Sequence, residues 1–235
     1  METRYSFREQ KVYDILPKGG YRVYYDEQEG TEPSTTIISF DPLETKDETY
    51  TVYRYLAVDV EDLDYNQIVV ALIRAEYSVD DELALLRQKD DKASEYNAYN
   101  AYVEKCKAIA HRTIEGDTLE TAKGLKIADL GIYDASEAVN AFYIGNQAMW
   151  LSPAIRTQYK DSLSDAKAAG VSMVEFAGAN MPTDDAIAAL TAINVYALQC
   201  QQNTAHHRAA IEALDSIAAV RAYDFTTGYP EKLSF

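Results

Sequence analysis

The middle of the chain, residues 63–114, limits the fold most, because it carries helical signals almost from end to end. Asp64 suits a helix N-cap, and Gln67 follows three positions later, where its side chain can bond back toward the cap. Ser78 suits a second N-cap, and the acidic run 80–82 after it complements the positive end of a helix dipole. We therefore expect a central helical segment.

Apolar residues recur in this segment at helical spacing. One face consists of Val79, Leu83 and Leu86. A second, coiled-coil-like face consists of Tyr96, Tyr99, Val103, Cys106 and Ala110. This second face lasts about two heptads, short of the three or four that are diagnostic of a coiled coil. It predicts either an amphipathic helix packed on its own domain or an oligomer seam with Tyr96, Tyr99 and Val103 as candidate interface residues.

Residues 1–62 predict a small antiparallel β domain. The expected elements are strands at 21–26, 35–40 and 49–60, with polar loops at 26–34 and 43–48. The last strand alternates most clearly, and it places Tyr53 and Tyr55 on its less apolar face. We expect that face to stay exposed and to contact a partner protein.

Residues 115–131 are polar and interrupted by glycines, so they predict a linker. Residues 132–235 then predict a compact C-terminal α+β domain. The whole chain is therefore expected to be an α+β protein. It would contain a small N-terminal antiparallel sheet, central helices, and a C-terminal module with a β-hairpin and long helices.

The C-terminal module carries clear local signals. Gly145-Asn146 predicts a two-residue hairpin turn of the primed kind. Ser152-Pro153 predicts a helix start, because serine caps a helix and proline needs no amide partner at the first position. A short strand is expected at 171–176, and a long helix is expected after Pro182.

The chain holds 38 acidic and 22 basic residues, and its net charge of −16 is spread along the sequence. With no basic segment, binding to nucleic acid through phosphate neutralisation is not expected, and neither is binding to anionic membranes. The first residues lack the pattern of a secretory signal, and no apolar run approaches ~20 residues. We expect a chain made in a cytoplasm, without membrane insertion.

Tyrosine is unusually frequent, with 19 tyrosines against 6 phenylalanines and 1 tryptophan. Its large ring and polar tip make tyrosine common where protein surfaces meet. Trp150 and Tyr143 could stack on sugar rings, which would suit a receptor for host glycans, or they could be cross-strand packing.

No set of residues has the spacing of a catalytic, cofactor or metal site. His206 and His207 are adjacent, so they point about 100° apart on a helix and cannot form a metal-binding pair at i and i+4. Cys106 and His111 could be imagined as nucleophile and base, but no oxyanion turn lies nearby. Neither a G-x-G-x-x-G nor a P-loop pattern is present. We expect no enzymatic activity, no cofactor and no metal.

Several weak motifs of the C-terminal half recur in a suggestive order. The motifs are 140–151, Arg156 and 168–171, then 207–214, Val220, 223–224 and 227–230. In this order they resemble an uncharacterised C-terminal domain of tail, tail-fibre and tail-assembly proteins of tailed phages and prophages, over residues 130–233. The helical stretch 72–82 resembles what precedes that domain in gut-bacterial phage proteins. The resemblance implies a role in the virion or its assembly, and it implies no catalytic residue.

Three functions remain open. The first and preferred one is a non-enzymatic structural component of a tailed-phage virion, tail or tail-fibre associated, which contacts other virion or tail proteins or self-associates. The second is a host-glycan or receptor-binding adhesin, or a tail-fibre assembly factor. The third is an enzyme acting on host surface polymer. The expected location for the first is the virion.

Overall fold

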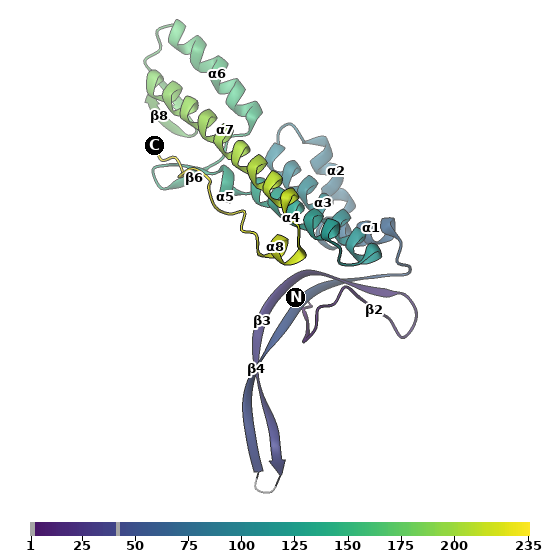
Figure 1. Ribbon diagram of the computed structural model, residues 1–235. Coiled ribbons are helices and arrows are strands. Elements are labelled where there is room, and N and C mark those ends of the chain that lie inside the picture. Colours follow the sequence, from purple (N-terminus) through teal and green to yellow (C-terminus); the bar gives the residue numbers. More distant parts are fainter. Residues whose placement is uncertain (1–2, 41–42) are drawn as a thin grey trace. The chain divides into compact units, whose positions relative to one another are not determined.

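The computed structural model describes residues 3–40 and 43–235, and it confirms the α+β fold (Figure 1). The chain divides into two compact units. Unit 1 comprises residues 1–78 and 106–121, and unit 2 comprises residues 79–105 and 122–235. The helices α3 (Ala93–Glu115) and α4 (Leu119–Asp134) each contribute residues to both units.

Unit 1 contains a four-stranded antiparallel sheet in the order β1-β4-β3-β2. Its strands are β1 (Tyr5–Phe7), β2 (Tyr13–Ile15), β3 (Tyr21–Phe40) and β4 (Leu43–Val60). β3 and β4 form one long hairpin, which continues past β1 and β2 as a two-stranded ribbon (Figure 1). The loops expected at 26–34 and 43–48 are therefore wrong, because these residues are parts of β3 and β4. Both stretches lack an apolar face, so hydrophobic alternation did not reveal them.

A β-bulge interrupts the pairing of this hairpin. Tyr25 pairs with Leu56 and Gln28 pairs with Arg54, so two residues of β3 lie opposite the single residue Tyr55 of β4. The first bulged residue, Asp26, has a φ of 54°, in the left-handed region that aspartate tolerates better than most residues. The bulge bends β3 and increases its local twist.

Both faces of the sheet are covered where its four strands meet. On one face the rings of Tyr5, Phe7, Tyr24 and Tyr55 form an aromatic cluster, with centroid separations from 5.1 to 6.2 Å. On the other side, helix α1 (Tyr65–Glu76) packs against β4. Its N-cap is Asp64, as predicted, and its side chain accepts from the amides of residues 66 and 67. Ile68 and Leu72 of α1 are fully buried.

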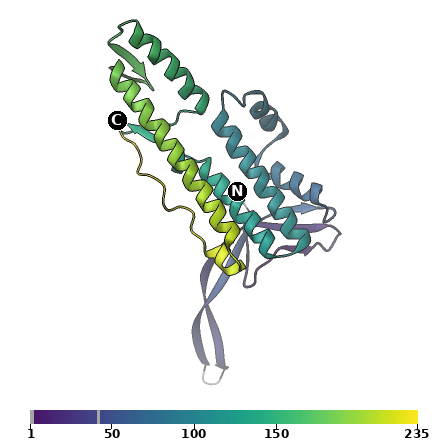
Figure 2. The same cartoon turned by 45° about the horizontal axis from the view of Figure 1, so that its top comes forward.

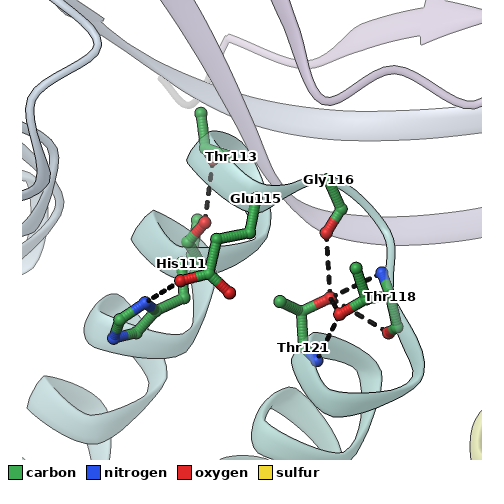
Figure 3. A network of polar contacts seen from close by, with 7 residues as sticks. His111, Thr113, Glu115, Gly116, Thr118 and Thr121 are labelled. Carbon is green, nitrogen blue, oxygen red and sulfur yellow. Dashed lines mark hydrogen bonds and ion pairs between the residues drawn. The ribbon is translucent and has the colours of Figure 1, made fainter.

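The turn from α3 to α4 is closed by two threonines (Figure 3). The amide of Thr121 donates to Oγ1 of Thr118 at 3.2 Å, and the amide of Thr118 donates to Oγ1 of Thr121 at 2.9 Å. This reciprocal arrangement resembles a capping box and starts α4 at Leu119. The linker expected at 115–131 is therefore wrong over most of its length, since α4 occupies it.

Unit 2 is built around two long helices, α6 (Pro153–Ala168) and α7 (Thr183–Ala213), which lie side by side (Figures 1 and 2). Ser152 caps α6, as predicted, and accepts from the amide of Ile155 at 3.3 Å. The core between α6, α7 and the nearby hairpins contains Phe142, Leu151, Leu163, Phe176, Ala177, Ala186, Ala189, Leu190 and Ile193. The shorter helices of the unit are α2 (Val79–Arg87), α5 (Glu137–Asn140) and α8 (Ile217–Ala222).

Two small hairpins complete unit 2. The predicted one joins β5 (Phe142–Ile144) to β6 (Gln147–Met149), and its turn residue Gly145 has a φ of 57°. The second joins β7 (Met173–Phe176) to β8 (Ala179–Pro182), and only its first strand was expected. Its turn residues Ala177 and Gly178 both have positive φ, which is the requirement of a type I′ turn.

The C-terminal segment after α8 is tied to α7 and then to β5. His207 of α7 lies 2.8 Å from the hydroxyl of Tyr223 and 2.8 Å from the carbonyl oxygen of Thr227. Farther on, the amide of Tyr143 donates to the carbonyl of Leu233, and the amide of Phe235 donates to the carbonyl of Tyr143. These bonds fix the segment along unit 2.

Candidate functional site

A groove of about 570 Å³ lies between α6 and α7 in unit 2. Its apolar lining consists of Leu163, Ile187, Leu190, Val195 and Leu198. Leu163 and Leu190 are buried at its floor, whereas Val195 and Leu198 are 51% and 54% exposed. An exposed apolar groove on a helical pair is the usual setting for helix-in-groove recognition.

The charge of the groove is opposite to that of the chain. Lys160 and Lys167 line it, and no carboxylate is among its lining residues. Lys167 also forms an ion pair with Asp184, with 2.9 Å between Nζ and Oδ1. In a chain with a net charge of −16, such a surface favours a partner that is apolar and acidic.

Helix α2 presents an exposed surface that is apolar and acidic. Val79, Leu83 and Leu86 are 53%, 43% and 47% exposed, so this predicted apolar face is not covered. The first turn of the same helix is acidic, with Asp80, Asp81 and Glu82. Leu85 is buried, and the carboxylate of Glu82 accepts a hydrogen bond from the hydroxyl of Tyr99. These two contacts hold α2 with its apolar face outward.

A smaller cavity of about 280 Å³ lies elsewhere in unit 2 and is lined by Trp150 and Arg156. Arg156 donates to Oδ1 of Asn194 at 3.3 Å, while its buried Nε has no hydrogen-bond partner. Burial lowers the pKa of Arg156. Chemically, the cavity could hold a small polar or anionic group. Tyr143 does not line it, so Trp150 and Tyr143 do not form one sugar-stacking platform.

The face of β4 that carries Tyr53 and Tyr55 was expected to be exposed, and the structure shows it to be largely covered. Tyr55 is 1% exposed, and its expected exposure is wrong. The reason lies in β1, which pairs with β4 so that Tyr5 lies opposite Tyr55. The rings of Phe7 and Tyr24 contact the ring of Tyr55. Burial raises the pKa of Tyr55 to about 12. Tyr53 is half-buried.

The candidate helical seam also lies largely inside the molecule. Tyr99 is 7% exposed, and Cys106 and Ala110 are fully buried. Tyr96 and Val103 are half-buried, and the rings of Tyr96 and Tyr99 are 6.5 Å apart. The structure therefore favours packing within the chain over an oligomer seam at Tyr99.

His111 and the two cysteines do not form a catalytic or metal site. His111 Nδ1 lies 2.9 Å from Glu115 on the exposed side of α3, whereas Cys106 is buried, so the two do not form a nucleophile and base (Figure 3). Burial raises the pKa of the Cys200 thiol.

Within residues 3–40 and 43–235, no group of three or more His, Cys, Asp or Glu side chains could hold a metal ion. No helix in the described part of the chain is long and apolar enough to cross a membrane.

The groove was missed by the sequence reasoning, although a signal for it exists. The predicted apolar stripe of α7 runs through Ile187, Leu190, Ala197 and Cys200. Val195 lies off that stripe, and Leu198 lies at its edge, about 20° from Ile187. Apolar residues outside the buried stripe of a helix indicate a second apolar contact.

The chain matches no known protein family, no curated protein and no solved structure in comparisons with all three.

Proposed function

We propose that this chain is a non-enzymatic structural component of a tailed-phage virion, associated with the tail or tail fibre, that acts through protein–protein interfaces. The observation that carries the interface part is the exposed apolar groove between α6 and α7. Exposed apolar grooves that are bordered by polar residues are a common setting for protein–protein recognition.

The assignment to a virion rests on the resemblance of residues 130–233 to the C-terminal domain of phage tail and tail-fibre proteins. The partners would be other virion or tail proteins and further copies of the chain. The net charge of −16 argues against nucleic acid as a partner.

Mass spectrometry of purified particles tests this function. We expect the chain in the particles at a fixed ratio to the tail proteins, and we expect particles made without it to lack normal tails or tail fibres in electron micrographs. A chain that is abundant in the lysate and absent from the particles would favour the assembly-factor alternative.

The alternative of a glycan- or receptor-binding adhesin has one observation in its favour, the cavity with Trp150 and Arg156. Aromatic rings stack on sugars, and a guanidinium can pair with a sugar carboxylate. A glycan array probed with the wild-type chain and with Trp150→Ala tests it. Binding that the substitution abolishes would favour the adhesin, and no binding by either chain would count against it.

A further inference from the structure

We propose that α2 of one copy of this chain docks into the α6–α7 groove of a second copy, so that the chain associates head to tail. This inference rests on the proposed function, since it names one partner of a protein that acts through interfaces. Both surfaces belong to unit 2, and both are exposed in the single chain.

The shapes of the two surfaces fit. Val79, Leu83 and Leu86 have the i, i+4, i+7 spacing of anchors that enter a groove as one ridge. Nine helical residues span about 13 Å. The α7 wall of the groove, from Ile187 to Leu198, spans about 16 Å by the same rise per residue, so the whole ridge can be seated.

The charges fit as well. The ridge is bordered by Asp80 and Asp81, and the groove is bordered by Lys160 and Lys167. Two copies with a net charge of −16 repel each other in most orientations. The pairing of this acidic helix with this basic groove therefore selects one orientation and disfavours others.

The ridge is already in place before binding. Leu85 is buried on the inner side of α2, and Glu82 accepts the hydrogen bond from Tyr99. Docking then requires little ordering of α2, which reduces the entropic cost of association.

The two surfaces are different, so the contact is heterologous and leads to a ring or to an open filament. A single short helix in a groove buries less than the ~1,200 Å² of a stable standard interface. We therefore expect self-association that is weak in solution, in the micromolar range, and dependent on concentration.

The test is analytical ultracentrifugation of the full chain and of two complementary variants. The ridge variant carries Leu83→Glu and Leu86→Glu, and the groove variant carries Val195→Glu and Leu198→Glu. Each variant alone should remain monomeric at concentrations where the wild type associates. An equimolar mixture should form a 1:1 dimer that does not grow, because one intact ridge meets one intact groove.

The matched control is Val70→Glu on α1, where the side chain is 53% exposed, and it should associate like the wild type. If a glutamate pair unfolds unit 2 by circular dichroism, the same positions are changed to serine, and a loss of affinity of at least tenfold is expected. A wild type that stays monomeric, variants that still associate, or a mixture that stays monomeric would each overturn the docking. If the chain stays monomeric in solution but is found in purified particles, the proposed function stands and only this contact is rejected.

Discussion

The hydroxyl of Tyr55 donates a hydrogen bond to Glu27 and accepts one from the backbone amide of Lys11, both at 3.0 Å. The three residues come from β4, from the bulge of β3 and from the connection between β1 and β2. Tyr55 therefore joins three segments of unit 1, and its polar tip is satisfied although the ring is buried.

Removing this hydroxyl should destabilise the protein measurably. Tyr55→Phe should lower the free energy of unfolding by about 1–2 kcal/mol, because the partly buried amide of Lys11 loses its acceptor. Tyr55→Ser should cost more, about 3–5 kcal/mol, since it also empties the space of the ring. Urea unfolding followed by circular dichroism measures both. The half-buried Tyr53, changed to serine, is the matched control with a smaller loss, and an equal loss at both positions would contradict the assignment.

Alkaline pH should unfold unit 1. Burial raises the pKa of Tyr24 and of Tyr55 to about 12, from an ordinary value of 10.0. A raised folded pKa gives stability that is complete below the unfolded pKa and is lost as the pH rises through the folded pKa. We therefore expect the stability to fall from about pH 10 to about pH 12.

Tyrosinate absorbance recorded together with circular dichroism checks this expectation. Tyr24 and Tyr55 should ionise late, together with the loss of β-structure, and the Tyr24→Phe variant should show one late tyrosine fewer. Burial also raises the pKa of Tyr77, Tyr196 and Tyr229, so these three should ionise late as well. Ionisation of every tyrosine near pH 10 with the fold intact would disagree with the burial of these rings.

The bulge residue Asp26 should tolerate glycine and reject a β-branched side chain. Its φ of 54° is strained for valine by about 1–2 kcal/mol and is unstrained for glycine. Asp26→Val should therefore lower the free energy of unfolding by about that amount more than Asp26→Gly does. Thermal unfolding of the two variants side by side decides the matter, and equal stability would argue against left-handed backbone at this position.

Removal of divalent metal should leave the protein unchanged. His207 makes its contacts with Tyr223 and Thr227, and the described residues contain no cluster of three metal-ligand side chains. Dialysis against EDTA should leave the Tm where it was. As a control, His207→Ala should lower the free energy of unfolding by about 1–3 kcal/mol, and therefore the Tm, with or without EDTA. A fall of many degrees on dialysis alone would reveal a structural metal.

Local signals in the sequence predicted much of the fold. The caps Asp64 and Ser152 and the turn at Gly145 were read correctly, because capping and turn chemistry involve only neighbouring residues. The continuity of β3 and β4 was not predicted, because residues 26–34 and 43–48 are mainly polar and give no burial signal. Helix α4 was hidden by Gly124 and Gly131, which resemble linker residues.

The candidate surfaces depended on distant parts of the chain, which local patterns do not report. Tyr55 was placed at the surface because nothing in β4 itself shows that β1 and Lys11 cover that face. Conversely, Leu83 and Leu86 had the spacing of a buried face and remain exposed. Periodicity shows that a helix has an apolar face, and only tertiary structure shows whether the same chain covers it.

The bulge at Asp26 also determines which changes in length the hairpin tolerates during evolution. Side chains alternate along a strand, and the two bulged residues share the position opposite Tyr55, so the residues on either side of the bulge keep the faces of their partners. Deleting one of the two bulged residues would restore regular pairing and keep every later residue on its face, whereas deleting a single codon elsewhere in β3 would move the later side chains to the opposite face. Adding or removing two codons in each strand would change the reach of the ribbon and keep both faces. Related chains should therefore differ in ribbon length by even numbers of residues per strand.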